Sequence, residues 1–160
     1  MHIHECMTMN AKACVPEQSC AIASEFMRRR RCGFVPIVDG PRTKRVVGVV
    51  TDRDIVRQLV RSDLPASRVA LKACMTPAPT MIAAEAPLEE AVRVMKQAAV
   101  RRLPVIDDGK LVGVLSLQDI ALAVRRQWAY IGPHVTEQHV TEILEAIAVA
   151  RERPPGGSRR

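Results

Sequence analysis

One strand-to-helix junction occurs twice in this chain, and this repetition constrains the fold more than any other feature. The two copies read Val46-Val47-Gly48-Val49-Val50-Thr51-Asp52-Arg53-Asp54-Ile55 and Leu111-Val112-Gly113-Val114-Leu115-Ser116-Leu117-Gln118-Asp119-Ile120. In each copy a run typical of a buried strand ends at a hydroxyl residue, and apolar residues at helical spacing follow. Thr51 and Ser116 are therefore predicted N-caps of the following helices. A chain that builds this junction twice is predicted to contain an internal repeat.

The repeat extends well beyond the two junctions. Cys6-Met7-Thr8 matches Cys74-Met75-Thr76, and the sequence offset between these two motifs also relates Pro36 to Pro104. From Gly48 and Gly113 onward the offset is shorter by three. The first copy therefore carries three extra residues in the loop around 41–44, and such insertions belong on a surface turn between strands.

Each copy is predicted to have the order β-α-β-β-α. The helix of the second copy is marked by an apolar stripe at i, i+3, i+4 and i+7, formed by Leu88, Ala91, Val92 and Met95. Turn residues join two further strands in each copy, so each pair is predicted to be a hairpin. The short first strands are expected near 13–15 and 81–83, and the hairpin strands at 34–38, 46–50, 103–106 and 111–115.

One copy alone is too small to bury two helices and a sheet well. We therefore expect a mixed α/β fold in which two copies pack sheet to sheet with pseudo-twofold symmetry. An apolar stripe outside the repeat, Val140, Ile143, Leu144 and Ile147, predicts a C-terminal helix. The expected boundaries are 6–60 and 74–127 for the copies, 61–73 for a linker, 134–152 for the terminal helix and 153–160 for a tail that is disordered by composition.

The element order strongly resembles the cystathionine β-synthase (CBS) domain, and two copies resemble the tandem pair called a Bateman module. Val-Pro-Ile-Val-Asp (residues 35–39) and Leu-Pro-Val-Ile-Asp (residues 103–107) carry the resemblance, together with the Thr/Ser-x-x-Asp that ends each junction. The resemblance covers about Cys6 to Val124. It implies a regulatory module without catalytic activity that senses an adenosine-containing ligand: AMP, ADP or ATP, or else S-adenosylmethionine or NAD.

Two interpretations of Thr51 and Asp54 follow from their spacing. Thr-x-x-Asp before an apolar helix is a capping box, which needs no ligand. The same geometry suits a phosphate at the positive end of the helix, with the Thr51 hydroxyl as a donor. Asp54 then accepts hydrogen bonds from a ribose diol, and Arg53 adds a cation near the phosphate. The two interpretations are compatible.

The resemblance assigns the remaining contacts to a nucleotide, which it implies binds in clefts between the two copies. Thr51 and Asp54 match the phosphate and ribose residues of site one, and Ser116 and Asp119 match those of site two. Gln118 replaces Arg53 in site two, which predicts weaker binding there. The implied adenine contacts, many through the backbone, are Ala13, Cys14, Phe34, Val35 and Pro36 in site one, and Met81, Ile82, Arg102, Leu103 and Pro104 in site two.

The basic composition leaves a second class of function open. The net charge is +7, and an arginine run occupies positions 28–31. These arginines fit either a solvated helix end or contacts to phosphate oxygens. A nucleic-acid-binding or purely structural module that uses them is the alternative to ligand sensing. Against nucleic acid, only 2% of residues are aromatic, so stacking platforms are scarce.

Several sequence motifs that mark other classes of protein are not evident in this chain. There is no nucleophile with a nearby base, no zinc spacing and no Walker glycine loop, so we expect no enzyme and no required cofactor or metal. His2, His4 and Cys6 alternate without an evident fourth ligand, and an exposed, frayed terminus explains them as well. No signal peptide, membrane span or disulfide pattern is evident among the five cysteines, which predicts a cytoplasmic protein. The apolar terminal helix and the resemblance predict at least a homodimer that signals to a protein partner.

Overall fold

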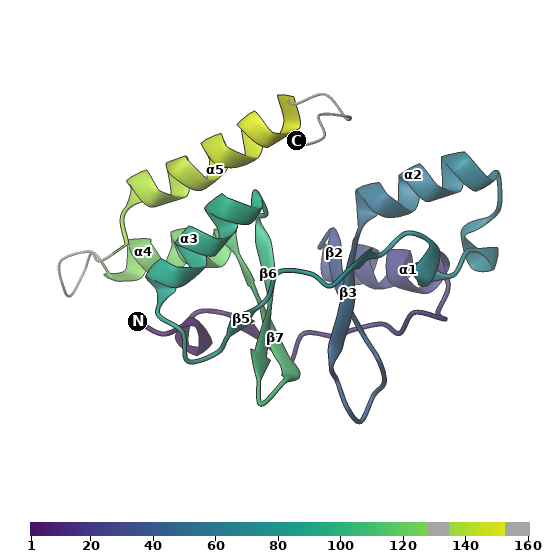
Figure 1. Cartoon of the computed structure of the whole chain (residues 1–160), viewed down its shortest axis with the longest axis horizontal. Helices are drawn as coiled ribbons and strands as arrows, with labels where there is room; N and C mark the ends of the chain where they lie inside the picture. Colours follow the sequence, from purple (N-terminus) through teal and green to yellow (C-terminus); the bar gives the residue numbers. More distant parts are fainter. Residues whose placement is uncertain (128–134, 153–160) are drawn as a thin grey trace, which may run out of the picture. The chain divides into compact units, whose positions relative to one another are not determined.

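The computed structural model describes residues 1–127 and 135–152, and it divides the chain into two compact units (Figure 1). The amino-terminal unit comprises Asn10–Pro79 together with Ile106–Val112. The carboxy-terminal unit comprises Met1–Met9, Thr80–Val105 and the chain from Gly113 onward. Each sequence copy thus supplies most, though not all, of one unit.

The amino-terminal unit has the predicted hairpin at its centre. Strands β2 (Phe34–Val38) and β3 (Val46–Thr51) pair antiparallel, with Phe34 opposite Thr51. Its sheet has the order β2-β3-β4. The other elements are α1 (Cys20–Arg30), α2 (Asp52–Ser62), the 3-10 turns η2 (Ala66–Arg68) and η3 (Leu71–Ala73), and β4 (Thr76–Pro77).

The carboxy-terminal unit repeats this arrangement and adds a helix. Its four-stranded sheet has the order β1-β7-β6-β5. The predicted helix stripe is confirmed, because Leu88, Ala91, Val92 and Met95 are all buried. The elements are η1 (Ile3–Glu5), β1 (Thr8–Met9), β5 (Ile82–Ala83), α3 (Leu88–Ala98), β6 (Arg102–Asp107), β7 (Lys110–Ser116), α4 (Leu117–Gln127) and α5 (Glu137–Glu152). The parts of β6 and β7 within 106–112 belong to the amino-terminal unit.

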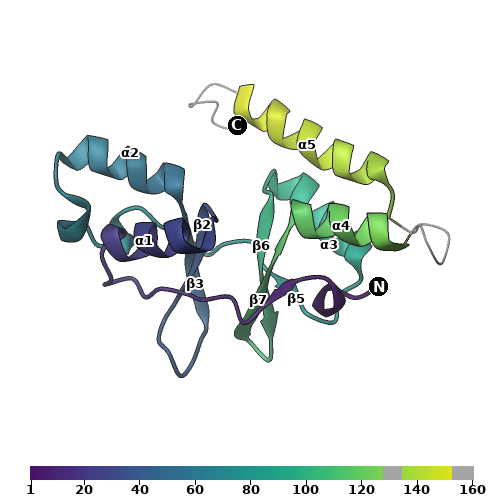
Figure 2. The same ribbon diagram turned by 180° about the vertical axis from the view of Figure 1, so that it is seen from behind.

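The opening segment of each sequence copy completes the sheet of the other copy. Strand β1 pairs with β7, as Figure 2 shows, and β4 pairs with β3. A glycine permits the close crossing in both places. A Cβ at Gly113 would lie 2.7 Å from the Met7 Sδ and from the Thr8 carbonyl oxygen, and one at Gly48 would lie 2.9 Å from the Met75 Sδ. The Cys-Met-Thr motif of each copy therefore packs against the strand glycine of the other copy.

Three expectations need correction. The first strand predicted near 13–15 is a single parallel bridge, between Cys14 and Ile37. The linker predicted to belong to neither copy packs into the amino-terminal unit, where Val69 and Leu71 are buried in the core. The amino terminus is not frayed, because Ile3 is fully buried and its N–H donates to the Ala86 carbonyl oxygen at 3.1 Å.

Helix α5 packs against α3 and α4 of its own unit (Figure 1). Ile143 and Ile147 of the predicted stripe are buried, whereas Leu144 remains 48% exposed. The stripe is thus largely covered within one chain, which removes most of the reason to assign it to a second subunit. Residue 134, where the helix was predicted to begin, and the predicted tail from 153 lie outside the described residues.

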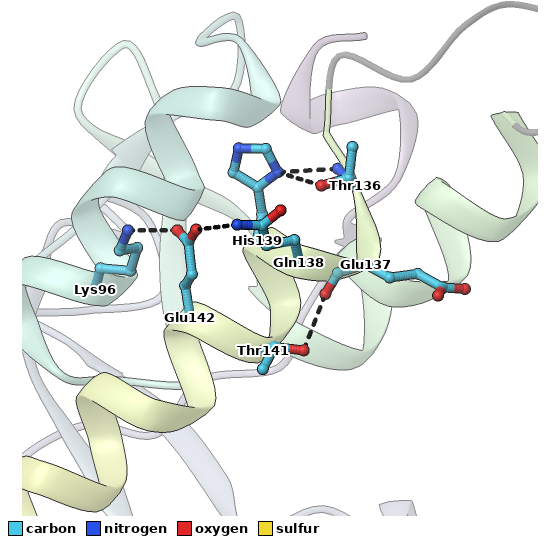
Figure 3. Close-up of polar contacts among 7 residues, drawn as sticks. All are labelled: Lys96, Thr136, Glu137, Gln138, His139, Thr141 and Glu142. Carbon is cyan, nitrogen blue, oxygen red and sulfur yellow. Dashed lines mark hydrogen bonds and ion pairs between the residues drawn. The ribbon is translucent and has the colours of Figure 1, made fainter.

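Polar contacts fix the start of α5 (Figure 3). The Thr136 N–H donates to His139 Nδ1 at 3.0 Å, and Lys96 of α3 lies 2.5 Å from Glu142. This ion pair lowers the pKa of Glu142 from its ordinary value. None of the helices within the described ranges has the length and apolarity needed to cross a membrane.

Candidate functional site

The two predicted capping boxes have the same geometry. The Thr51 N–H and hydroxyl both donate to Asp54 Oδ2, at 2.9 and 2.6 Å, and the Asp54 N–H donates to Thr51 Oγ1 at 3.2 Å. The corresponding bonds between Ser116 and Asp119 measure 2.8, 2.6 and 3.2 Å. All four side chains are half-buried. The cap predicted from the spacing is therefore confirmed in both copies, and it forms without a ligand.

Each cap leaves one oxygen of its aspartate carboxylate available as a hydrogen-bond acceptor. Both cap hydrogen bonds to Asp54 use Oδ2, and those to Asp119 do likewise. Within the described ranges, Oδ1 of neither aspartate accepts a hydrogen bond. An ionised carboxylate is an acceptor at both oxygens, so Oδ1 remains available for a ligand hydroxyl.

The first turns of α2 and α4 differ at one residue that sequence reasoning missed. The Asp52 carboxylate accepts a hydrogen bond from the Arg53 N–H at 2.8 Å, so it already occupies the positive end of α2. The corresponding residue in α4, Leu117, is buried. The sequence signal was available, because an acidic residue directly after an N-cap is typical of a helix start.

Asp52 changes the expected ranking of the two sites. A phosphate at the end of α2 must displace or approach the Asp52 carboxylate, whereas α4 has no such anion. The formal charge of positions 52–54 is −1, since Arg53 offsets one of two aspartates, and that of positions 117–119 is also −1. Site two lacks a counterpart of the Arg53 cation and also of the Asp52 anion, so the two first turns have the same formal charge.

Many predicted adenine contacts belong to the hydrophobic cores. Cys14 and Val35 lie in the core of the amino-terminal unit, and Ile82 and Leu103 are buried in the carboxy-terminal unit. Pro36 and Pro104 are also buried. Their side chains are committed to packing, so any contact with a ligand uses their backbone. The side chains with exposed surface are Ala13, Phe34, Met81 and Arg102.

The arginine run at 28–31 is partly engaged on its own helix. Arg28 and Arg29 both bind Glu25, with N–O distances of 2.7 and 2.6 Å. These hydrogen bonds lower the pKa of Glu25 to about 2. For Arg28 and Arg29 the geometry favours a solvated helix end over contacts to phosphate oxygens. Arg53 is exposed and forms no ion pair with any described residue.

A thiol accompanies each cap, which sequence reasoning did not anticipate. Burial, followed by the nearby Asp119 charge, raises the pKa of Cys6 to about 11. Burial, the contact with Cys20 and the Asp54 charge raise the pKa of Cys74 to about 12. The Cys20 and Cys74 sulfurs lie 3.7 Å apart. The repeated Cys-Met-Thr motif, which places Cys6 and Cys74 at matching positions, was the available signal for this symmetry.

The amino-terminal histidines contact the segment before α3. His2 Nδ1 lies 2.7 Å from the Glu85 carbonyl oxygen, and His4 Nδ1 lies 3.2 Å from Glu85 Oε1. Across the described part of the chain, no three His, Cys, Asp or Glu side chains are grouped as metal ligands. Both histidines thus have a polar partner at Glu85.

Comparison with known proteins identifies the repeat. The model of the CBS domain matches the chain twice, at residues 3–61 and 70–126. The CBS domain-containing protein YhcV of Bacillus subtilis is 30% identical over 124 residues, which cover 75% of this chain and 83% of that protein. Hypoxic response protein 1 of Mycobacterium tuberculosis is 31% identical over 144 residues, covering 89% of this chain and 94% of that protein.

Among solved structures, the chain is similar to CBSX2 in complex with AMP, a CBS-pair protein from Arabidopsis thaliana. The TM-score is 0.65 and the sequence identity is 27%, covering 78% of this chain and 96% of that chain. The AMP complex is a property of CBSX2.

Proposed function

Since the chain belongs to the CBS domain family, as a tandem pair, we propose that it is a regulatory module that binds an adenosine-containing ligand of the AMP, ADP or ATP class. Binding changes its conformation and so signals to a protein partner. The observation that carries the proposal is the pair of matching caps, each of which holds an aspartate with Oδ1 available. The AMP complex of CBSX2 supports the ligand class.

Each cap supplies two groups to such a ligand. Asp54 or Asp119 accepts hydrogen bonds from the ribose hydroxyls, worth about 1.5–3 kcal/mol for a charged acceptor. The end of α2 or α4 attracts the phosphate through the helix dipole, with Arg53 as an added cation at α2. The Thr51 and Ser116 hydroxyls, which donate to the aspartates in the caps, can rotate and donate to a phosphate oxygen of the ligand instead.

Signalling follows if the ligand prefers one conformation. A ligand shifts a conformational equilibrium only by its differential affinity for the two states, and such coupling is typically about 1–3 kcal/mol. This suffices to regulate a partner without altering the fold. The proposed role requires no bond making or breaking, so we infer that the module is not an enzyme.

Calorimetric titration with AMP, ADP and ATP tests the proposal. Asp54→Ala and Asp119→Ala should each weaken one binding event about tenfold or more, the equivalent of about 1.4 kcal/mol. Asp107→Ala is the matched control, because Asp107 is an exposed carboxylate outside both caps. Thermal unfolding of each variant separates lost binding from lost structure. Unchanged titrations for both cap variants would refute the proposed site.

Asp52→Asn gives the converse test at the same helix. Removing this carboxylate should strengthen binding of a phosphate-bearing ligand at α2, because the anion no longer competes at the helix end. Binding of adenosine, which has no phosphate, should change little. If Asp52→Asn weakens AMP binding instead, the phosphate does not lie at this end of α2.

We also propose that a second copy of the chain is a partner. Helix α2 leaves Val56 59% and Val60 80% exposed on one face. Exposed apolar rows of this kind often mark interfaces. Light scattering at micromolar concentration should return the mass of a dimer, and a monomer mass with and without nucleotide would overturn this part of the proposal.

A further inference from the structure

A cavity of about 290 Å³ lies beside the closed end of the β2–β3 hairpin, and all its lining residues belong to the amino-terminal unit. The buried side chains of Val38 and Leu111 form its apolar wall. Two exposed lysines, Lys12 and Lys44, line it as well. The cavity thus combines an apolar surface with two cations.

Backbone hydrogen bonds hold both basic segments in place. Lys44 has a left-handed backbone, with φ of 51°, which is uncommon for a residue with a side chain. Its N–H donates to the Gly40 carbonyl oxygen at 3.0 Å, and its own carbonyl oxygen accepts from the Leu111 N–H at 2.9 Å. Asn10, just before Lys12, also has a positive φ, and its N–H donates to the Val112 carbonyl oxygen at 2.9 Å.

The second sequence copy keeps this backbone but not the cations. Gly109 corresponds to Lys44 in the alignment that pairs Gly48 with Gly113, and it has a φ of 71°. Thr80 corresponds to Lys12 in the alignment that pairs Cys6 with Cys74. The first copy therefore places a lysine where glycine is the less strained choice, in the loop that carries the three extra residues. Strained positions of this kind tend to cluster at functional sites.

The two lysines have no carboxylate partner among the described residues. Asp39, the acidic residue of this loop, is already bound by the Thr43 hydroxyl and by Arg45. These contacts lower the pKa of Asp39, so it stays ionised and paired. Neither Lys12 nor Lys44 forms an ion pair with any residue that the structure describes. The cavity therefore has an excess of positive charge.

We propose that this cavity binds a small phosphate monoester. A phosphate monoester carries a charge of about −1.5 to −2 at neutral pH, which matches two ammonium groups. Lysine binds phosphate as a point charge with three donors. Val38 and Leu111 suit a short carbon body next to the phosphate.

The cavity is distinct from the proposed nucleotide site and does not depend on it. Its volume lies just below the roughly 300–1,000 Å³ typical of ligand pockets, which favours a ligand smaller than a nucleotide. Lys44 precedes β3, whereas Thr51 ends it, and a strand rises about 3.3 Å per residue, so the two lie roughly 20 Å apart along the strand. Ala13 is the one residue that lines the cavity and also belongs to the predicted nucleotide set.

Nuclear magnetic resonance titration of the full chain with glycerol 3-phosphate tests the proposal, with glycerol as the uncharged probe. Glycerol 3-phosphate should shift the amide signals of residues 10–13, 44 and 111 in a saturable way, and glycerol should not. Lys44→Gly and Lys12→Thr introduce the residues of the second copy at these positions. Each should weaken binding about tenfold, as expected for the loss of one charged contact.

Two controls keep the outcome decisive. Lys44→Gly relieves the left-handed strain, so the variant should fold at least as well as the parent. Lys110→Ala removes an exposed lysine that does not line the cavity, and it should bind like the parent. The proposal is overturned if Lys44→Gly binds as tightly as the parent, if glycerol produces the same shifts, or if the shifts appear only at Thr51 and Ser116.

Discussion

At the scale of single residues, Asp52 and Asp54 place two carboxylates in the first turn of α2. Asp54 is bound by Thr51 through Oδ2, while Asp52 is bound to the Arg53 N–H. The first turn of α2 is thus satisfied without a ligand, and a phosphate has to compete for it. At α4 the apolar Leu117 takes the place of Asp52. The two proposed sites therefore differ in what a phosphate displaces.

Cys6 and Cys74 are expected to resist alkylation at moderate pH. Burial, together with the neighbouring aspartate, raises the pKa of Cys6 to about 11 and contributes to a pKa of about 12 at Cys74. The thiolate is the reactive form, so at pH 8 each should react with iodoacetamide about a hundredfold or more slowly than in the unfolded chain. Peptide-resolved mass spectrometry across pH 7–10, with and without guanidinium, measures this difference.

The same shifts set the direction of the pH dependence of stability. A thiol whose folded-state pKa is raised stabilises the fold below the ordinary pKa of 9.0, and this contribution is lost as pH rises toward 11 or 12. Equal alkylation rates in the folded and unfolded chain would contradict the burial of these thiols.

At the scale of elements, α5 behaves as part of the carboxy-terminal unit. Ile143 is fully buried in this unit, where α5 packs against α3 and α4, and Lys96 holds Glu142 at the same contact. The amino-terminal unit has no equivalent helix among its residues, and its α2 keeps Val60 exposed. The added helix thus distinguishes two otherwise similar units.

Ile143→Ala should destabilise the carboxy-terminal unit by about 2–5 kcal/mol, the usual cost of truncating a buried isoleucine. Leu144→Ala is the matched control, because Leu144 is the next residue and is 48% exposed. It should change the free energy of unfolding by less than half as much. Urea unfolding of both variants gives the comparison, and similar costs for the two would contradict the packing of α5.

Local patterns were predictable from the sequence, and contacts distant in the chain were not. The Thr51–Asp54 cap follows from a spacing of three residues, and the stripe of α3 follows from helical periodicity, so both were found. The bridge at Cys14 and the burial of Leu71 depend on which segment packs beside them. The local sequence does not determine that choice, so it did not show that the first strand is a single bridge or that Leu71 is buried.

The site was predictable to a similar extent. The aspartates and their hydroxyl partners were found because a junction that recurs in one chain stands out. Asp52 was overlooked although its position directly after the N-cap was a signal in the sequence, and the structure adds its hydrogen bond from the Arg53 N–H. The cavity beside Lys44 was also invisible, since Lys12, Lys44 and Leu111 lie far apart in the chain.

At the scale of the whole molecule, each sequence copy contributes its opening segment to the sheet of the other copy. Residues 1–9 include the opening of the first copy yet fold with the second, where the His4 N–H donates to the Ala84 carbonyl oxygen at 3.0 Å. Residues 74–77 open the second copy yet complete the first sheet. Neither copy, excised at its sequence boundaries, therefore contains a complete unit.

Removal of residues 2–9 should weaken the later part of the chain rather than the part that follows directly. The deletion removes the buried Ile3 side chain and the β1 edge beside β7. Hydrogen exchange should show lost amide protection in α3 and β7, with α1 and β2 little changed. Protection lost first in α1 and β2 would show that the segment folds with its sequence neighbours.

If both caps take part in binding one class of ligand, saturating AMP should change the hydrogen exchange of both. The first turns of α2 and α4 should gain amide protection, at Asp54 and at Asp119, and Asp54→Ala should abolish the gain at α2 while sparing that at α4. If AMP binds but leaves the exchange of both first turns unchanged, the caps serve only the fold, and the nucleotide is recognised elsewhere.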